Sequence, residues 1–407
     1  MRIVMVAPFS VYPKGTVSIR MLPIATMLAK RGHNVSIVVA PYDNSSESGK
    51  EYVLEGVKIY NIKFRDFPLV KYPLTLISVC QRIFRLRPQC VYAFKPKGYS
   101  GLVAMFLASL KRFGFLKNLK LVLDSDDLEG YGGFSDYFRE LSIYPKSMLY
   151  FFDFQERWIP KHVDAITVAS RALETRIIER GISPDKVFYV PNGAPQRDFN
   201  VDDDEVVVLR RSLGLENVPV ILLYTRFFEY KVEKVIEVLK CVKKELNDVK
   251  LLVIGKGEFG EEKKLEDLAL REGLNDSVVF GGWIESKDIP KYLAIGDVAM
   301  YPFDDTPLNR AKCPGKLVEL MIAKLAIVAD RVGQIAEYIK NGESGILVDS
   351  DAPTREFALS IVKVLKNGAL QRKLGVNSQN RILNAFNWAK LTDEVERAIS
   401  FARKGTL

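Results

Sequence analysis

The chain has few of the residues that metal and acid–base sites usually require. Only two histidines, His33 and His162, occur among its 407 residues. Both lie between helical and strand-like segments, where we expect them to be structural. No Cys-x-x-Cys pair or zinc-ligand spacing relates the four cysteines, which are Cys80, Cys90, Cys241 and Cys313. We therefore expect reduced cysteines and an intracellular protein.

Several longer signals are also missing. No run of about 18 apolar residues occurs, so we expect no transmembrane helix. The first apolar strand begins at once, without a charged segment and an apolar segment before it, so we expect no signal peptide. After that strand the sequence APFSVYPKGTVS holds one glycine, Gly15. This excludes the Gly-x-Gly-x-x-Gly fingerprint and a Walker A loop, although Gly15 can still let a loop approach a ligand closely.

Positive charge, in contrast, is in excess. The chain has 59 Lys and Arg against 50 Asp and Glu, a formal net charge of +9. Such a charge favours anionic partners: nucleotides, phosphates, nucleic acids or lipid headgroups. Between residues 65 and 120 the basic residues alternate with aromatic and aliphatic ones. This region is either two core helices with solvated Lys and Arg on their outer faces or a surface for an anionic membrane.

Short apolar runs alternate with helical patterns along the whole chain, which predicts an α/β protein with parallel, doubly wound sheets. In the first half the expected strands are residues 4–7, 35–40, 57–62, 91–94, 119–123, 165–169 and 187–190, with helices at 18–31 and 173–180. In the second half the expected strands are 220–224, 249–254, 277–280, 298–301, 326–329 and 345–348, with helices at 234–246, 263–272, 315–323 and 355–365.

A segment rich in Pro, Gly, Asn and Asp, residues 191–205, separates the two series and is typical of a linker. We therefore predict two Rossmann-like domains, residues 1–195 and 196–385, that face a cleft. A terminal helix is expected within residues 386–407. Ligands of doubly wound sheets bind outside the carboxyl ends of the strands, and domain clefts are preferred small-molecule sites, so we expect the functional site there.

Basic residues follow the first strand of the second domain. That strand ends at Thr225, which places Arg226 at its carboxyl end and Lys231 on the following turn. Arginine offers a bidentate fork for phosphate oxygens and lysine a flexible point charge, so the pair could neutralise a diphosphate. The next two strands are followed by candidate backbone contacts for the same ligand, at Gly255, Gly257, Trp283 and Ile284.

The strongest local signal is NRAKCPGKLVEL, residues 309–320. Pro314 stands where the first turn of a helix tolerates proline, and the free N–H groups of that turn form an anion site. Lys316 adds positive charge to the turn. Glu319 lies three residues later on the same face, where its carboxylate can accept both hydroxyls of a ribose.

The first domain carries three close aspartates within LVLDSDDLEG: Asp124, Asp126 and Asp127. The first two have the spacing of an Asp-x-Asp metal site, which holds Mg²⁺ or Mn²⁺ beside a diphosphate. The Arg–Lys pair of the second domain would already neutralise that leaving group. A divalent metal is therefore not required, and we expect none.

These motifs, in this order, resemble glycosyltransferase family 4, whose members are retaining enzymes with the GT-B fold. The resemblance covers nearly the whole chain. It rests on the Pro-Asn-Gly turn at 191–193, ILLYTR with Lys231, Gly-Lys-Gly at 255–257, FGGW at 280–283, the Pro-x-Lys-x-x-Glu core at 314–319, ADRVGQIAEYI, NGESGILV and the Phe-Asn-Trp lead into the last helix. It implies transfer of a sugar with retention, a donor held by the second domain, an acceptor held by the first, and a last helix that crosses back to the first domain.

The resemblance also implies roles for single residues. Arg226 and Lys231 match the diphosphate-binding pair, and Glu319 matches the second Glu of a Glu-x7-Glu motif, which holds the ribose. The first Glu of that motif falls at position 311, where this chain has Ala311. Asn309, Arg310 and Lys312 are the candidates to replace its contact with the donor sugar. The nucleotide-sugar contacts expected in this segment are Lys312, Lys316, Leu317 and Glu319.

Many members of that family also have a histidine in the first domain, after the strand that here gives LVLDSDDLEG. This chain has none there. Asp126 or Asp127 is therefore expected to take over the contact to the donor sugar or to its oxocarbenium-like charge.

We thus predict a retaining glycosyltransferase of the hexosyltransferase type. Its co-substrate is a nucleotide-diphosphate sugar, no further cofactor is required, and its acceptor is a glycan or a lipid-linked molecule. We expect a cytoplasmic protein with a peripheral position on the inner face of an anionic membrane.

Three alternatives stay open. One is a nucleotide-sugar 2-epimerase of the same architecture, which the scarcity of histidine disfavours. Another is a basic nucleic-acid-binding protein, which would need basic patches with exposed aromatic stacking platforms; the mixed basic and apolar helices lead us to expect no nucleic acid. The third is a non-catalytic nucleotide-sugar binder, suggested by Ala311.

Overall fold

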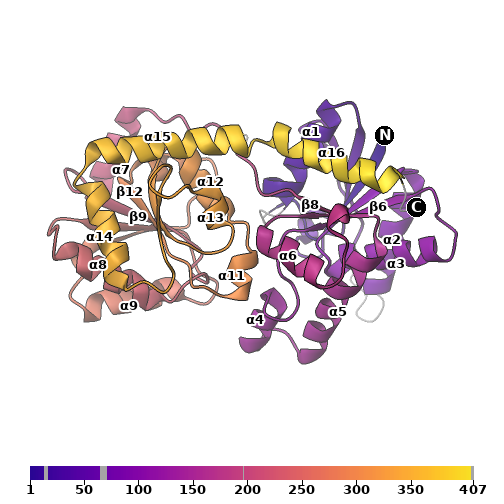
Figure 1. Cartoon of the computed structure of the whole chain (residues 1–407), viewed down its shortest axis with the longest axis horizontal. Coiled ribbons are helices and arrows are strands. Elements are labelled where there is room, and N and C mark those ends of the chain that lie inside the picture. The colour runs from indigo at the N-terminus through magenta and orange to yellow at the C-terminus, as the bar shows by residue number, and fades with distance from the viewer. Residues whose placement is uncertain (13–16, 65–70, 196, 405–407) are drawn as a thin grey trace. The chain divides into compact units, whose positions relative to one another are not determined.

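The structure, a computed structural model, describes residues 1–12, 17–64, 71–195 and 197–404. Gly15 lies outside these residues. Internal contacts divide the chain into two compact units. The first unit is Met1–Gly193, Ala311–Cys313 and Asn387–Leu407, and the second unit is Ala194–Arg310 and Pro314–Phe386. Each unit is an α/β domain built on a mostly parallel sheet (Figure 1), which confirms the predicted fold class.

The first unit has an eight-stranded sheet in the order β3-β4-β2-β1-β5-β6-β7-β8. Its strands are β1 (Arg2–Ala7), β2 (Asn34–Val39), β3 (Glu51–Leu54), β4 (Val57–Asn61), β5 (Cys90–Phe94), β6 (Lys120–Ser125), β7 (Ala165–Val168) and β8 (Val187–Tyr189). Every pairing is parallel except that of β3 with β4. The central strands β1 and β5 are almost entirely buried, which explains why they read as continuous apolar runs in the sequence.

Helices cover both faces of this sheet. They are α1 (Leu22–Lys30), α2 (Lys71–Arg85), α3 (Gly98–Arg112), α4 (Phe134–Glu140), α5 (Lys146–His162), α6 (Arg171–Glu179) and α16 (Trp388–Lys404), with a π-helical turn at Val17–Met21 before α1. The terminal helix α16 contacts α1 and strands β6 to β8. Its buried Trp388, Val395 and Ile399 join the core of the first unit. The last helix therefore packs on the first unit, as expected.

The second unit has a six-stranded, fully parallel sheet in the order β11-β10-β9-β12-β13-β14. Its strands are β9 (Val220–Tyr224), β10 (Lys250–Ile254), β11 (Val278–Gly282), β12 (Val298–Tyr301), β13 (Ala326–Asp330) and β14 (Ile346–Val348). Its helices are α7 (Asp203–Ser212), α8 (Val232–Lys243), α9 (Glu261–Arg271), α10 (Ile289–Ala294), α11 (Pro307–Ala311), α12 (Gly315–Ile322), α13 (Ile335–Tyr338), α14 (Thr354–Leu365) and α15 (Gly368–Ala385).

Two local expectations need correction. The sequence analysis missed the β3–β4 hairpin, which turns through Glu55 and Gly56, both at positive φ. Two such residues form the tight turn that suits a hairpin, but β3 has only four residues and none of them is fully buried. The linker is also shorter than expected, because α7 begins at Asp203. The side chain of Asp202 accepts a hydrogen bond from the Asp204 amide and so caps that helix.

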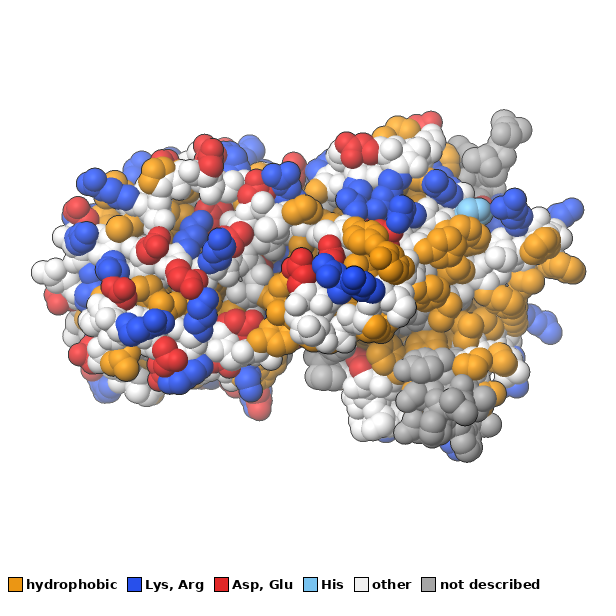
Figure 2. All heavy atoms as spheres, turned by 90° about the horizontal axis from the view of Figure 1, so that it is seen from below, with side chains coloured by type: hydrophobic (Ala, Val, Ile, Leu, Met, Phe, Trp, Pro, Cys, Tyr) orange, Lys and Arg blue, Asp and Glu red, His pale blue; other side chains and the backbone are white. Residues whose placement is uncertain are grey.

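The first unit exposes an unusual number of large apolar side chains. Both α2 and α3 bury one face in the core, but their outer faces and the segment after α3 expose Ile77, Phe84, Phe106, Phe113 and Phe115. The α4–α5 region adds Leu141, Ile143, Tyr150, Phe151 and Phe154. Figure 2 shows hydrophobic side chains gathered on one face of this unit. No helix in the described part of the chain is long and apolar enough to cross a membrane.

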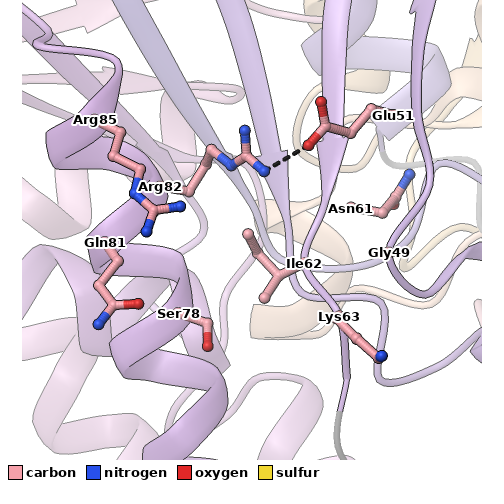
Figure 3. Close-up of a pocket in the computed structure, with 9 residues that line it drawn as sticks. All are labelled: Gly49, Glu51, Asn61, Ile62, Lys63, Ser78, Gln81, Arg82 and Arg85. Atoms are coloured by element: carbon pink, nitrogen blue, oxygen red, sulfur yellow. Dashed lines mark hydrogen bonds and ion pairs between the residues drawn. The ribbon is translucent and has the colours of Figure 1, made fainter.

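A basic pocket of about 210 Å³ lies where α2 meets the β3–β4 edge of this sheet. Lys63, Arg82 and Arg85 line it (Figure 3). Arg82 also donates a hydrogen bond to the Glu51 carboxylate at 2.5 Å and lies 4.7 Å from the centre of the Tyr60 ring. The pocket thus gathers three cations beside one carboxylate, that of Glu51.

Candidate functional site

The loops after β9 and β10 meet closely at the carboxyl edge of the sheet of the second unit. Gly255, which follows β10, has a φ of +120°. A Cβ atom at this position would lie 1.9 Å from the Thr225 carbonyl oxygen. Only glycine therefore lets the two loops approach in this way, and the approach brings Arg226 to the same edge.

Glu319 on α12 is the centre of a polar cluster within the second unit. Its carboxylate accepts one hydrogen bond from Arg197 at 2.5 Å and another from the Tyr224 hydroxyl at 2.9 Å. The Arg197 guanidinium also donates to the carbonyl and hydroxyl oxygens of Ser286, at 2.9 and 2.7 Å. The linker before α7, the end of β9, the loop after β11 and α12 are thereby held together around one carboxylate.

Lys316 lies against this cluster, with its Nζ 3.3 Å from the centre of the Tyr224 ring. The pKa of Lys316 is lowered to about 8. Burial is the largest cause, the charges of Glu319 and Glu229 oppose it, and those of Arg226 and Arg197 add to it. The three cations are thus close enough to oppose one another. Such a field at the N-terminus of α12 is suited to an anionic ligand.

The two residues of the predicted diphosphate pair, Arg226 and Lys231, have different partners in the structure. Arg226 forms an ion pair with Glu258 at 2.8 Å, and both side chains are half exposed. Exposed pairs of this kind contribute little to stability, so an incoming phosphate can replace Glu258. Lys231 is the N-cap residue of α8 and is exposed; its amide donates to the Asp304 carboxylate at 3.0 Å. The charge of Arg226 acts on Lys316 in the cluster around Glu319, and the role of the Arg226–Lys231 pair toward a diphosphate stays a prediction.

The other predicted contacts of the second unit differ in what they can offer. The Gly257 amide donates to the Glu262 carboxylate at 3.0 Å, so an anion would have to displace that side chain. Trp283 follows β11 with its side chain 71% exposed, and Ile284 next to it is half-buried. Leu317 is fully buried, so only its backbone can meet a ligand.

Ala311 has a structural reason to be apolar. It is buried in the core of the first unit, and its carbonyl oxygen accepts a hydrogen bond from the Ser170 hydroxyl at 2.7 Å. A carboxylate at this position would be buried among apolar side chains, which is costly without a paired cation. The nearby Cys313 carbonyl accepts a hydrogen bond from the Asn192 side-chain amide at 2.7 Å.

Of the three candidates to replace the missing carboxylate, Asn309 and Arg310 already bind other residues. Asn309 is buried and donates to the backbone oxygens of Glu229 and Asp304 at 2.6 and 2.8 Å. Arg310 forms an ion pair with Asp305 at 2.5 Å. Lys312 is buried, with its Nζ 5.8 Å from the centre of the Phe134 ring.

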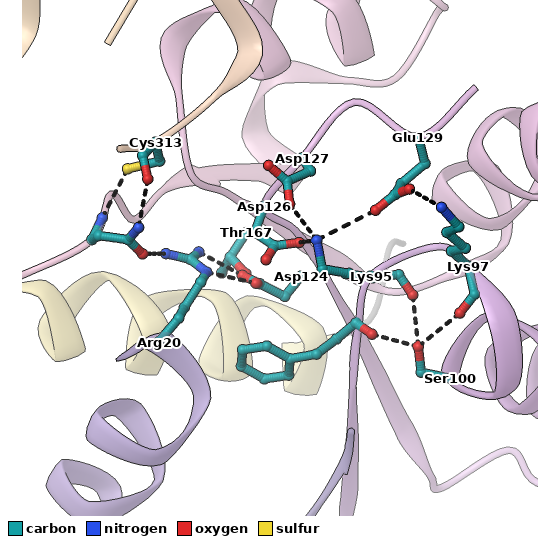
Figure 4. A network of polar contacts seen from close by, with 12 residues as sticks. Arg20, Lys95, Lys97, Ser100, Asp124, Asp126, Asp127, Glu129, Thr167 and Cys313 are labelled. Carbon is teal, nitrogen blue, oxygen red and sulfur yellow. Dashed lines mark hydrogen bonds and ion pairs between the residues drawn. The ribbon is translucent and has the colours of Figure 1, made fainter. Parts of the chain in front are cut away.

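Asp124 in the first unit is a structural residue. Its carboxylate accepts two hydrogen bonds from Arg20, both at 2.7 Å, and one from Thr167 at 2.6 Å (Figure 4). The Asp-x-Asp spacing therefore does not leave this carboxylate open to a metal. Within the described residues, no group of three or more His, Cys, Asp or Glu side chains is arranged to hold a metal ion.

Asp126 and Asp127 instead share the ammonium of Lys95, with Asp126 at 3.2 Å. Glu129 lies 3.3 Å from the same ammonium and 2.8 Å from that of Lys97. The pKa of Asp126 is raised to about 7. Burial is the largest cause, Lys95 opposes it, and Asp127 and Asp124 add to it. Figure 4 shows the carboxylates gathered around Lys95.

The sequence analysis missed several residues of these clusters, among them Arg197, Lys95 and Arg20. Arg197 lies in the segment interpreted as a linker, where a charged residue carries no local signal. Lys95 directly follows a buried strand, as Arg226 does, so the position of a basic residue at the end of β5 was the signal available. Arg20 lies within a segment with a helical pattern. The sequence of that segment does not reveal that this side chain is completely buried.

The chain has the two parallel-sheet α/β domains of the GT-B class of glycosyltransferases. Residues 15–193 match the family model described as a glycosyl transferase 4-like domain, and residues 208–381 match the one described as glycosyl transferases group 1. The chain belongs to the family 4-like glycosyltransferases, as its resemblance to them predicted.

Relatives and solved structures agree with this assignment. The chain is 24% identical over its whole length to one subunit of the phosphatidylinositol N-acetylglucosaminyltransferase of Arabidopsis thaliana, and the match covers 84% of that relative. Over 58% of its length it is 22% identical to a GDP-mannose-dependent phosphatidylinositol monomannoside mannosyltransferase of Mycobacterium tuberculosis, of which the match covers 63%. The crystal structure of Anabaena HepE with UDP and glucose aligns with a TM-score of 0.72 at 18% identity, covering 98% of this chain and 99% of that one.

Proposed function

We propose that the chain is a retaining glycosyltransferase that takes a sugar from a nucleoside-diphosphate sugar. The observation that carries this proposal is the cluster in the second unit, in which Glu319 is held by Arg197 and Tyr224 beside Lys316. It joins a carboxylate that can accept ribose hydroxyls to cations that can bind a diphosphate. The complex of HepE with UDP supports a nucleotide donor of this kind.

Each residue of the cluster then has a defined task. Glu319 accepts hydrogen bonds from the ribose, and Arg197 and Tyr224 fix its orientation. Arg226 exchanges Glu258 for the diphosphate and, with Lys316 and the N-terminus of α12, stabilises the negative charge that develops as the glycosidic bond breaks. The leaving phosphate takes the proton of the acceptor hydroxyl, so that the sugar is attacked on the face from which the phosphate leaves. This sequence of steps requires no metal.

A thermal-shift screen of UDP-, GDP- and ADP-sugars tests the donor assignment. We expect at least one donor to raise the melting temperature, since a ligand that binds only the folded state stabilises it. Product release is then measured with the donor found, and NMR of the product reports whether the anomeric configuration is retained. Binding without transfer to any acceptor would leave only a nucleotide-sugar binder, and an inverted product would contradict retention.

Arg226→Ala tests the charge stabilisation. We expect turnover to fall by about 10²–10³-fold, as it does when a preorganised donor to a developing charge is removed. Arg211→Ala is the matched control, because Arg211 also forms an exposed ion pair in the second unit, with Glu216 at 2.8 Å. Equal turnover of both variants would defeat the assignment. Full activity in excess EDTA is the expected result for a reaction without a metal.

We further propose that the acceptor is presented at an anionic membrane and is bound by the first unit. The exposed apolar side chains on α2, α3 and the α4–α5 region support this, together with the adjacent pocket lined by Lys63, Arg82 and Arg85. Apolar groups beside cations suit a headgroup region. The names of the plant and mycobacterial relatives both include phosphatidylinositol, a membrane lipid, which also supports an acceptor at a membrane.

Sedimentation with liposomes tests the membrane proposal. We expect retention on vesicles that contain phosphatidylglycerol, weaker retention at high salt, and none on pure phosphatidylcholine. Replacing Phe113 and Phe115 by Ser should reduce the retention. Val208→Ser, at an exposed apolar position of α7 in the second unit, should leave it unchanged. A protein that stays in solution with both kinds of vesicle would contradict the proposal.

A further inference from the structure

The ammonium group of Lys95 is buried at the end of β5 in the first unit. Lys95 directly follows this strand with a φ of +66° and a side chain that is 4% exposed. Its backbone is fixed on both sides: its amide donates to the Asp124 carbonyl at 2.9 Å, and the Ser100 hydroxyl donates to its carbonyl at 2.9 Å. A non-glycine residue with this backbone conformation is strained, and such strain persists only where the surroundings hold the residue in place.

The charges around this ammonium do not balance. Lys97 and Glu129 form their own pair at 2.8 Å. Burial acts to raise the pKa of Glu129, but Lys97 and Lys95 outweigh it and lower the pKa. Lys95 is then left with two carboxylates, those of Asp126 and Asp127. A purely structural buried ion pair needs one anion for each cation, because an uncompensated buried charge is costly.

The two carboxylates differ in access. The Asp127 side chain is 22% exposed, whereas those of Asp126 and Glu129 are 9% and 3% exposed. All of them follow β6 at the carboxyl edge of the sheet, where doubly wound sheets bind their ligands. Of the carboxylates around Lys95, Asp127 is therefore the one placed to meet a substrate.

We propose that Lys95 is a positioning residue for sugar transfer: it favours the ionised form of the Asp126–Asp127 pair and orients Asp127 toward the sugar substrate. This inference rests on the proposed glycosyltransferase function. Lys95 itself touches no substrate. It acts through Asp127, which accepts a hydrogen bond from a sugar hydroxyl or stabilises the positive charge that develops on the donor sugar.

The proposal makes the charge state of the pair depend on Lys95. Asp126 is faced by Lys95 from the end of β5, by Arg20 from the turn before α1, and by Asp124 and Asp127 from its own segment. Burial lowers the pKa of Lys95, but Asp126, Asp127 and Glu129 together raise it well above its usual value, so Lys95 stays charged. Because the charge of Lys95 acts to lower the pKa of Asp126, loss of the ammonium should raise that pKa, and the pair should keep its proton to a higher pH.

The test is the pH profile of turnover for Lys95→Met and Lys95→Arg. We expect Lys95→Met to shift the acidic limb of the profile to higher pH by about one pH unit or more, since this limb reports the ionisation of the Asp126–Asp127 pair. Lys95→Arg keeps the positive charge, so its acidic limb should lie close to that of the wild type. Affinity for the free nucleoside diphosphate, measured by calorimetry, should stay unchanged in both variants.

Lys111→Met is the matched control. Lys111 forms an ion pair with Asp164 at 2.5 Å at the opposite, amino end of the strands and is also largely buried. A structural role for Lys95 would lower the melting temperature in both variants without moving either profile, and that result overturns the proposal. If Lys95→Met does not fold, Asp127→Asn decides: a loss of turnover of about 10²-fold supports the proposal, and unchanged turnover overturns it.

Sugar transfer by the wild-type protein is measured first. This order distinguishes a failure of the proposed glycosyltransferase function from a failure of the proposed role of Lys95. A wild-type protein that transfers no sugar refutes the proposed function and this inference with it. A wild-type protein that transfers sugar, combined with an unmoved profile for Lys95→Met, refutes the inference alone.

Discussion

Arg20 and Asp124 form a doubly hydrogen-bonded ion pair that is completely buried in the first unit, with both N–O distances at 2.7 Å. Arg20 also donates to the Val190 carbonyl oxygen at 2.7 Å, and Thr167 donates to Asp124. The pair therefore ties the π-helical turn before α1 to β6 and to the end of β8. This explains why Asp124, although part of an Asp-x-Asp sequence, belongs to the core of the first unit.

Breaking this pair should be costly. We expect Arg20→Met or Asp124→Asn to lower the free energy of unfolding by about 3–5 kcal/mol, because each leaves an unpaired buried charge. Urea unfolding measures the change. Glu394→Gln is the control, since it breaks the exposed Arg397–Glu394 pair and should cost less than about 1 kcal/mol. A loss of under about 1 kcal/mol for Arg20→Met would show that the pair is not the determinant we infer.

Glu319→Gln should weaken binding of the free nucleoside diphosphate. Hydrogen bonds to a charged group contribute about 1.5–3 kcal/mol, which corresponds to about 10–100-fold in dissociation constant. Isothermal calorimetry measures the effect. Glu258→Gln, which removes the exposed partner of Arg226, should leave the affinity equal or improve it, because an anion that competes with the phosphate is lost. Equal affinities for wild type and Glu319→Gln would remove Glu319 from the nucleotide site.

Lys316 should make nucleotide binding dependent on pH. With a pKa of about 8 in the free protein, Lys316 is mostly charged at pH 7 and mostly neutral at pH 9. An anionic ligand favours the charged form, so affinity should fall as pH rises above about 8, by at most about tenfold per pH unit for one proton. Calorimetry at pH 7 and pH 9 measures this. Lys316→Met should bind weakly at both values, and a wild-type affinity that is constant with pH would contradict the assignment.

Gly255→Ala should damage both stability and the nucleotide site. The added Cβ would meet the Thr225 carbonyl oxygen at 1.9 Å, and the backbone conformation is one that other residues rarely adopt. We expect a loss of about 2 kcal/mol or more in the free energy of unfolding and weaker nucleotide binding. Gly260→Ala is the control, since Gly260 also has a positive φ but no atom lies within 4 Å of the place that its added methyl group would take. If Gly255→Ala and Gly260→Ala lose similar amounts of stability, backbone strain alone explains the loss and the contact with Thr225 does not.

Much of the site was readable because its residues follow buried strands or open a helix. Gly255 directly follows β10, Arg226 follows β9 after Thr225, and Trp283 follows β11. Glu319 is placed by the helix that begins after Pro314. Their roles toward a nucleotide sugar remain predictions, as do retention, the acceptor and the cellular location. The identity of the family and the GT-B fold are confirmed.

The sequence by itself determined the buried strands, because burial on both faces of a parallel sheet demands continuous apolar runs, and it placed the loops where those strands end. Only the tertiary structure decided which charges meet. Arg197 pairs with Glu319 across 122 positions, and Arg20 pairs with Asp124 across 104. Lys95 meets Asp127 across 32. Such partners are selected by the order of strands in a folded sheet, and no local pattern of residues records that order.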